Sequence, residues 1–399
     1  MDVKTLESRH VLQTYKRAPV VFTRGEGVYL FDESGQRYLD LISGVGVASL
    51  GHANPALAEA LADQARTLVH TSNLYFHTLQ GDVASRLASL SGLSRTFFCN
   101  SGTEAMEGCL KFARRFWHTA GEGGRTGLVA LEHAFHGRSM GSLSVTWDEH
   151  YRAPFAPLLQ GVVWVRPDDP AALHAAVSPQ TTAIVIEAIQ GEGGVRPLSP
   201  EFAKAVKEAQ ERTGALLIAD EVQCGLGRTG DAFGFQRLGL QPDLVAVGKA
   251  LGGGMPVGAV LVSERVAAAV SAGDHGSTYG GNLLACRAAL TFLNALTAGG
   301  LMEHVREVGA QIAEGLCGLA GKHTVIREVR GAGLMWGLDL TVDAAPFVQA
   351  ALARRVLINR TAETVIRLLP PFVISSAEVA EALGQLDAIL TDGVRERAA

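Results

Sequence analysis

The chain has 399 residues, of which 47% are hydrophobic and 19% are charged, as in an ordinary globular protein. Its net charge of -5 and isoelectric point near 6.2 give no basic footprint, which argues against nucleic acid or an anionic membrane as a partner. The N-terminal segment lacks the apolar core of a signal peptide, and no apolar run has the length of a membrane helix. We therefore expect a cytoplasmic protein.

Short apolar runs alternate with amphipathic helical stretches along most of the chain, which predicts an α/β fold with a mostly parallel central sheet. Near the N-terminus, residues 28–30 and 38–41 flank the turn signal Glu33-Ser34-Gly35 and predict a hairpin. Helices are predicted at 103–117 and 200–213. The strands of a sheet that is covered on both faces are expected at five nearly continuous apolar runs: 95–99, 128–131, 183–187, 215–219 and 244–247.

The pattern changes after about residue 285, where helix, two strands (326–329 and 335–340), helix, strand and helix follow one another. Both ends of the chain therefore predict a smaller α+β domain, and the middle predicts the large sheet domain. We expect residues 1–65 and 285–399 to form the two parts of the small domain, and residues 66–284 to form the large one.

Neither the cysteines nor the histidines form a pattern that is typical of metal or disulfide sites. The five cysteines contain no CxxC pair, and we interpret them as small buried hydrophobic residues with reduced thiols. His133 and His136 lie on a turn before Gly137 without a third ligand nearby, so the sequence predicts no metal.

Three predicted strands end in polar or glycine-rich turns, where ligands of parallel α/β sheets bind. In the first, FFCN-SGTEA, Gly102 permits a tight turn and Ser101 or Thr103 can cap the helix that follows. The exposed N–H groups and the dipole of a helix start would bind a phosphate there. An ordinary capped helix without a ligand is the alternative.

The second of these turns begins with an acid, and the third begins with a lysine. Asp220 follows the apolar run ALLIA, where a carboxylate is costly unless a protonated heteroaromatic nitrogen, a helix cap or an arginine pairs with it. Lys249 follows LVAVG, and it must lose its proton to act as a nucleophile or base; a lysine that extends to the surface is the alternative. A phosphate cup, an acid for a ring nitrogen and a lysine for an aldehyde are together what pyridoxal 5′-phosphate (PLP) requires.

From about Tyr15 to Ser375, the sequence resembles class III (ornithine-type) aminotransferases. The motifs that carry the resemblance occur in the order of the family, among them FFCNSGTEAMEGCLKFAR, HAFHGRSMGSLSVT, IEAIQGEGGVRP, LIADEVQCGLGRTG and PDLVAVGKALGGGMPVGA. HTSNLY and INRTAETVIRLLPP are most similar to the acetylornithine aminotransferases of this class. The resemblance implies the fold-type I architecture of PLP enzymes and a homodimer with active sites at the subunit interface.

The resemblance also assigns residues to the cofactor. Lys249 matches the lysine that forms the Schiff base, and Asp220 matches the partner of the pyridinium nitrogen; these are the expected catalytic residues. The other cofactor contacts match, in turn, the partner of the phenolic oxygen, the ring that stacks on the cofactor, the phosphate cup, and a threonine that reaches the phosphate from the other subunit: Gln223, Phe135, Ser101–Gly102–Thr103, and Thr278. Core packing for Phe135 and a plain turn for Thr278 are the alternatives.

Five positions match contacts of the substrate. Arg138 and Arg367 match the two family arginines that hold carboxylates, for which a planar guanidinium is suited. Glu192 matches the acid that neutralises Arg367 while an ω-amine reacts and moves away when 2-oxoglutarate binds; surface ion pairs are the alternative for these charges. Tyr15 matches a further substrate contact. Val45 stands where ornithine aminotransferases carry a tyrosine that helps to hold a free α-amino group, and its lack of a hydroxyl favours an acylated α-nitrogen.

The resemblance implies a ping-pong transfer of the terminal amine of N-acetylornithine to 2-oxoglutarate, which yields N-acetylglutamate semialdehyde and glutamate in arginine biosynthesis. Related ω-aminotransferases that act on carrier-linked lysine, succinylornithine, ornithine or 4-aminobutyrate are the nearest alternatives. An aminomutase or epimerase, or a scaffold with a degenerate site, are the more distant ones. Gly108, inside the helix predicted after the phosphate cup, has no functional interpretation at this level.

Overall fold

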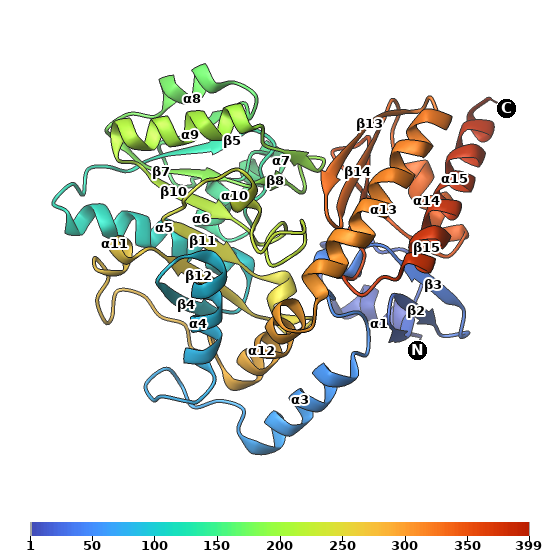
Figure 1. Cartoon of the computed structure of the whole chain (residues 1–399), viewed down its shortest axis with the longest axis horizontal. Coiled ribbons are helices and arrows are strands. Elements are labelled where there is room, and N and C mark those ends of the chain that lie inside the picture. Colours follow the sequence, from blue (N-terminus) through green and yellow to red (C-terminus); the bar gives the residue numbers. More distant parts are fainter. Residues whose placement is uncertain (1, 399) are drawn as a thin grey trace.

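The computed structural model describes residues 2–398. Its largest element is a seven-stranded sheet with the order β4-β12-β11-β10-β7-β5-β6 (Figure 1). β12 runs antiparallel to β11 and β4, and the other neighbouring pairs are parallel, so the predicted mostly parallel sheet is confirmed. Its strands are β4 (Arg95–Cys99), β5 (Gly127–Leu131), β6 (Val162–Val165), β7 (Thr181–Ile186), β10 (Leu216–Asp220), β11 (Leu244–Val247) and β12 (Gly258–Val262).

The predicted strands agree closely with the observed ones. β4 and β11 have the predicted bounds, and β10 is displaced by one residue, so that Asp220 is its last residue. β7 ends one residue earlier than predicted, which places Glu187 directly after it. Two acidic residues, Asp220 and Glu187, therefore lie at the carboxyl ends of the neighbouring parallel strands β10 and β7.

Both faces of this sheet are covered by helices, which explains why the strands at its centre are buried along their whole length and largely apolar. On one face, alternate strand residues such as Ile218 and Val260 pack against α5 (Gly102–Thr119). On the other face, residues such as Leu217 pack with α9 (Pro200–Thr213) and α12 (Leu283–Thr297).

Gly108 has a packing role in this arrangement. A Cβ at Gly108 would lie only 2.7 Å from Val260 Cγ2, so the glycine permits the close approach of α5 to β12. This contact offsets the cost of about 1 kcal/mol that glycine carries inside a helix.

The two ends of the chain lie together beside the large sheet (Figure 1). A four-stranded sheet joins them, because β15 (Val356–Leu357) pairs in parallel with β3 (Arg37–Asp40). β1 (Phe22–Glu26), β2 (Tyr29–Asp32) and β3 are antiparallel neighbours, and β2 with β3 forms the predicted hairpin. The domain boundaries at residues 65/66 and 284/285 stay a prediction.

A second four-stranded sheet is antiparallel and has the order β13-β14-β17-β16. Its strands are β13 (Ile326–Ala332), β14 (Met335–Leu340), β17 (Val365–Leu368) and β16 (Asn359–Thr361). Three helices lie beside it in Figure 1: α13 (Leu301–Lys322), α14 (Ala345–Ala353) and α15 (Ser376–Ala398). This sheet carries Arg367, one of the two arginines singled out from the sequence.

Shorter elements connect these parts. They are α1 (Val3–His10), α2 (Ser43–Gly46), α3 (Pro55–Thr67), α4 (Gln80–Ser91), α6 (Met140–Ser144), α7 (Glu149–Arg152), η1 (Ala153–Phe155), α8 (Pro170–Ala176), β8 (Ile189–Gln190), β9 (Arg196–Pro197), α10 (Gly234–Arg237), η2 (Lys249–Gly252) and α11 (Glu264–Ala267). Four of the five cysteines are buried as expected, whereas Cys317 on α13 is exposed. Within residues 2–398, no single helix passes the length and apolarity test for a membrane span; α12 and α13 pass it only as a pair bent by 63°.

Candidate active site

A cavity of about 260 Å³ lies where β4, β10 and β11 end. These strands run in the same direction, so their carboxyl ends meet at one edge of the sheet. Among its lining residues are eight that the sequence or the resemblance singled out: Gly102, Thr103, Phe135, Arg138, Glu192, Asp220, Gln223 and Lys249. The structure therefore brings together side chains that lie up to 147 positions apart, from 102 to 249.

The start of α5 forms one wall of the cavity. Ser101 is the N-cap of the helix, because its Oγ accepts the Glu104 N–H at 3.3 Å. A Cβ at Gly102 would lie 2.6 Å from Val222, so only glycine permits the backbone to pass there. The first N–H groups of a helix have no partner inside the helix. They are the donors that an anion would use at this position.

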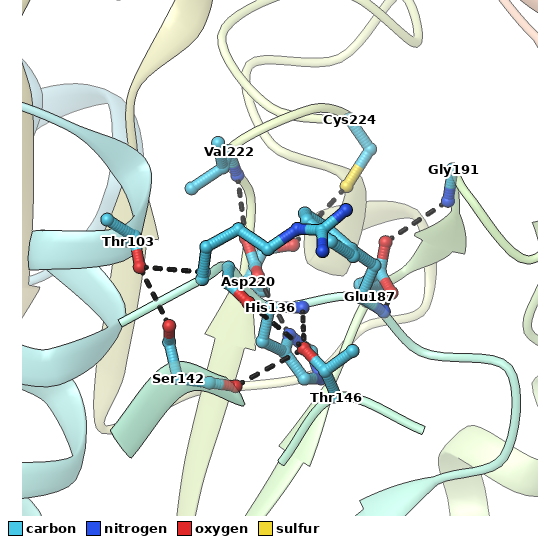
Figure 2. Close-up of polar contacts among 12 residues, drawn as sticks. Thr103, His136, Ser142, Thr146, Glu187, Gly191, Asp220, Val222 and Cys224 are labelled. Carbon is cyan, nitrogen blue, oxygen red and sulfur yellow. Dashed lines mark hydrogen bonds and ion pairs between the residues drawn. The ribbon is translucent and has the colours of Figure 1, made fainter. Parts of the chain in front are cut away.

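The Thr103 hydroxyl links α5 to the loop that carries Phe135 and Arg138. Its Oγ1 lies 2.7 Å from the hydroxyl oxygens of Ser139 and Ser142 (Figure 2 shows the Ser142 contact), and it accepts the Arg138 N–H at 3.1 Å. The wall formed by α5 and the wall formed by this loop are therefore held at a set distance from one another.

Asp220 is not alone at the end of β10. Its Oδ2 lies 2.8 Å from Nδ1 of His136, and its Oδ1 accepts the Val222 N–H at 3.0 Å (Figure 2). Both Asp220 and His136 are buried. Burial alone lowers the pKa of His136, but the hydrogen bond to Asp220 and the charges of Asp220 and Glu187 outweigh it and raise this pKa above its usual value. The imidazole thus holds the carboxylate in one orientation.

Lys249 begins the short helix η2, directly after β11 and Gly248. Its φ of 41° lies in the left-handed region, which is rare for a residue other than glycine. Burial lowers the pKa of Lys249, and the Arg367 charge lowers it further, against the opposing effect of carboxylates such as Glu192. Within the described residues, its amine has no hydrogen bond or ion pair. Its lower pKa makes the neutral, nucleophilic form more accessible.

Arg367 and Glu192 form a close ion pair at the edge of the cavity. Arg367 Nη1 lies 2.6 Å from Glu192 Oε1 and 3.1 Å from Gln223 Oε1, and its side chain is only 1% exposed. Burial alone would raise the pKa of Glu192, but the adjacent guanidinium of Arg367 lowers it overall. Glu192 is therefore charged at neutral pH, and it neutralises the arginine.

Arg138 has no ion pair within the described part of the chain. Its guanidinium carbon lies 3.8 Å from the ring centroid of Tyr151 and 5.4 Å from that of Phe135. Such stacking leaves the edge of a guanidinium open to a carboxylate. Arg138 is exposed at the mouth of the cavity and is free to bind an anionic substrate group.

The sequence interpretation missed two functional candidates, His136 and Glu187. Glu187 is buried, and burial raises its pKa to about 7. Its carboxyl oxygens accept the N–H groups of Phe135 at 3.0 Å and Gly191 at 3.1 Å (Figure 2 shows the Gly191 bond). The signal that pointed to Asp220, an acid at the end of an apolar strand, was also present at Glu187. The sequence around His136 invites only a metal-ligand interpretation, and its contact with Asp220 has no local signal.

Five residues singled out from the sequence do not line this cavity. One is Arg367, which reaches its edge through Glu192 and Gln223. Ser101 lies just behind it as the cap of α5. Tyr15 is 75% exposed, and its ring meets the guanidinium of Arg17 at 6.0 Å. Val45 is on the turn α2 with a φ of 64°, and Thr278 is exposed. A single chain thus does not assemble these side chains around Lys249, and their assigned contacts stay predictions.

A larger cavity of about 590 Å³ adjoins the first and shares Phe135 and Glu192 with it. It extends between the 146–152 segment and the 360–363 segment. Arginine and acidic side chains both line it. The two cavities together provide room for a substrate that is longer than the reacting amine and its carbon.

Comparisons with known proteins agree with this geometry. The family model for class III aminotransferases matches residues 11–390. An acetylornithine aminotransferase of Archaeoglobus fulgidus is 44% identical over 96% of this chain and 99% of its own length. An ornithine aminotransferase of Toxoplasma gondii is 31% identical and superposes with a TM-score of 0.94 over 98% of this chain and 95% of that one. A PLP-bound amine transaminase from an uncultivated Pseudomonas species is also 31% identical, with a TM-score of 0.88 over 95% of this chain and 97% of that one.

The chain belongs to the class III aminotransferases, as its motifs indicated. Enzymes of this class depend on PLP, and the α/β fold observed here is that of solved PLP aminotransferases. Among its relatives, acetylornithine aminotransferases match it over nearly their whole length. Transamination with PLP is therefore the chemistry of the class to which this chain belongs. The site residues bear on which amine it uses.

Proposed function

We propose that this enzyme transfers the terminal amine of N-acetylornithine to 2-oxoglutarate, with N-acetylglutamate semialdehyde and glutamate as products. The observation that carries the proposal is the Arg367–Glu192 ion pair at the edge of the cavity that holds Lys249. An arginine whose charge is offset by a paired carboxylate suits an ω-amine donor, which has no carboxylate beside its reacting carbon. The same arginine, once unpaired, suits the carboxylate of 2-oxoglutarate. Relatives named acetylornithine aminotransferase support the choice of donor.

The residues around the cavity fit PLP. Helix α5 offers free N–H donors and a helix dipole for the phosphate at Gly102 and Thr103, after the Ser101 cap. Asp220, held by His136, offers a buried negative charge for a ring nitrogen. When bound, PLP supplies an aldehyde that takes up an amine and a ring that withdraws electrons from the reacting carbon.

The remaining steps belong to side chains of this chain. Lys249 Nζ would bind the aldehyde and, once released by substrate, move a proton from the amine-bearing carbon of the substrate as a general base. Asp220 would keep a proton on the ring nitrogen, and Gln223 would bond the phenolic oxygen. Phe135 would stack on the ring face. Arg138 would hold the carboxylate at the far end of the donor.

We also propose a homodimer in which Thr278 reaches the phosphate site of the second subunit. Leu74, Tyr75 and Phe76 are 84%, 71% and 105% exposed, which is unusual for neighbouring apolar residues of a monomer. This segment adjoins the loop of Thr278, because Asn73 Nδ2 donates to the Ser277 carbonyl at 3.1 Å. A second subunit would cover both. A cytoplasmic location and a place in arginine biosynthesis belong to the same proposal.

A panel of amine donors tests the proposed substrate. N-acetylornithine, N-succinylornithine, ornithine, 4-aminobutyrate and carrier-linked lysine are each compared, with 2-oxoglutarate as acceptor, by kcat/KM. We expect N-acetylornithine to exceed ornithine by about tenfold or more, because Val45 offers no hydroxyl to a charged α-amino group, which would be left unpaired. A preference for ornithine or 4-aminobutyrate would contradict the proposal. Turnover without glutamate formation would indicate an aminomutase or epimerase instead.

The lowered pKa of Lys249 predicts how the apoenzyme recombines with PLP. Only the neutral amine attacks an aldehyde, so the rate rises with pH and levels off above the pKa of the amine. Because burial and Arg367 lower this pKa, the plateau is expected at lower pH than for the free side-chain amine of Nα-acetyllysine in solution. Glu192→Gln removes a charge that raises the pKa, and it should move the profile to still lower pH. A pH profile of the rate identical to that of Nα-acetyllysine would refute the prediction.

A further inference from the structure

The backbone that carries Glu192 is held from both sides of this residue. On the preceding side, the Gly191 N–H donates to Glu187 Oε2 at 3.1 Å. At Glu192 itself, the carbonyl oxygen accepts a hydrogen bond from Thr361 Oγ1. Glu187 follows β7 of the large sheet, whereas Thr361 is the last residue of β16. The two contacts therefore come from different sheets.

The next two residues are held in the same manner. Arg196 Nε donates to the Gly193 carbonyl, and Arg330 Nε donates to the Gly194 carbonyl, each at 2.8 Å. Arg330 is buried and is anchored by Asp339, whose Oδ2 lies 3.0 Å from its Nη1. Each residue from 191 to 194 thus has one backbone N–H or carbonyl group that bonds to a side chain.

Close packing leaves this backbone little room to shift. A Cβ at Gly191 would lie 2.0 Å from Gln223 Oε1, and one at Gly193 would lie 2.5 Å from the His133 carbonyl oxygen. By contrast, the side chain of Glu192 is 36% exposed. The carboxylate can therefore rotate while its backbone stays in place.

The antiparallel sheet β13-β14-β17-β16 connects these contacts to Arg367, which lies on β17. β16 pairs with β17 in a register that sets Asn359 opposite Arg367 and Thr361 opposite Val365. Residues two apart on a strand face the same side, so Asn359 and Thr361 share the face on which Arg367 meets Glu192. Asn359 Oδ1 accepts Arg367 Nε at 3.4 Å, and Thr361 bonds the Glu192 carbonyl. One strand thus positions both members of the ion pair.

We infer that Thr361 is a positioning residue for substrate exchange. Its hydroxyl fixes the backbone of Glu192 at the distance from Arg367 that the ion pair requires, so that Glu192 changes partners by side-chain rotation alone. The inference rests on the proposed function, in which Glu192 pairs with Arg367 for the ω-amine donor and leaves it for the dicarboxylate. Without the hydroxyl, the backbone of Glu192 is no longer fixed relative to Arg367, and the ion pair between the two side chains is weakened. The reaction with the amine donor, which needs Arg367 neutralised, is then impaired. The reaction with glutamate, which needs Arg367 free, is not.

The test uses the Thr361→Val holoenzyme, in which the side chain keeps its shape and loses its donor. Each half-reaction is followed separately through the cofactor absorbance, with N-acetylornithine in one case and glutamate in the other. We expect kcat/KM for N-acetylornithine to fall about twofold to tenfold, the effect of one net hydrogen bond, and kcat/KM for glutamate to change less than that. Thr361→Ser, which retains the hydroxyl, should restore the ratio of the two. Thr341→Val is the matched control, since its hydroxyl bonds a carbonyl away from this segment.

Hydrogen–deuterium exchange gives a second measurement that needs no substrate. Backbone amides of residues 191–194 should exchange faster in Thr361→Val than in the wild type, and at the wild-type rate in Thr361→Ser. If the wild type does not react with N-acetylornithine, the proposed function fails and exchange alone decides the role of Thr361. Unchanged exchange in Thr361→Val, or an equal loss in both half-reactions, would overturn the inference.

Discussion

Lys249→Ala is expected to lower kcat by about 10⁴-fold or more, because a positioned general acid–base alone contributes about 10²- to 10⁴-fold and the covalent link to the cofactor is lost as well. The structure supports so large an effect from a single substitution. Lys249 lines the cavity without a competing partner among the described residues, and burial together with Arg367 lowers its pKa. Single-turnover absorbance measurements and steady-state assays would measure the effect.

The variant should also lose the absorbance of the protein-linked cofactor after dialysis, while keeping its fold. Lys111→Ala is a suitable control, because Lys111 is an exposed lysine of α5 whose Nζ contacts His275 at 2.8 Å, outside the cavity. It should have wild-type activity and absorbance. A Lys249→Ala protein with normal turnover would remove Lys249 from the mechanism.

Asp220→Asn is expected to lower kcat by about 10²- to 10³-fold, the usual loss when one preorganised electrostatic contact of a buried site is removed. The amide keeps the size of the side chain but carries no charge to hold a proton on the ring nitrogen. It also withdraws the carboxylate that raises the pKa of His136, which should then fall. Steady-state kinetics give the first effect, and NMR titration of the imidazole gives the second.

A matched control exists between α15 and the end of α13, outside the cavity. Asp387 also pairs with a histidine, since its Oδ1 lies 2.6 Å from Nε2 of His323. Asp387→Asn should therefore disturb an Asp–His pair without changing kcat. Equal activity of the Asp220→Asn and Asp387→Asn variants would show that the charge at Asp220 has no part in catalysis.

Much of the large sheet could be predicted from local patterns. The bounds of β4 and β11 followed from nearly continuous apolar runs, because a strand covered on both faces is largely apolar. The start of α5 was predicted to within one residue, at Thr103, whereas the sequence leaves open whether Ser101 or Thr103 is its cap; the structure shows Ser101 as the cap. Three polar turns at the ends of parallel strands must meet at one edge of the sheet, so the site itself could be located from the sequence.

The detailed contacts of the site could not be predicted in this way. His136 meets Asp220 across 84 positions, and Thr361 meets Glu192 across 169. Contacts at such separations depend on strand order and register, for which a local pattern has no signal. Gly108 shows the same limit: its sequence context indicated only a cost, and its reason is the approach of α5 to Val260 on β12.

The sequence by itself thus determined the class of enzyme, the cofactor and the residue types of the site, because these depend on motifs in which chemistry and backbone geometry are local. Only the tertiary structure decided how the charges are held: the imidazole behind Asp220, the two backbone N–H groups on Glu187, and the strand that positions both Arg367 and Glu192. These contacts arise where buried polar groups from separate elements must find partners, and packing alone determines which partners they meet.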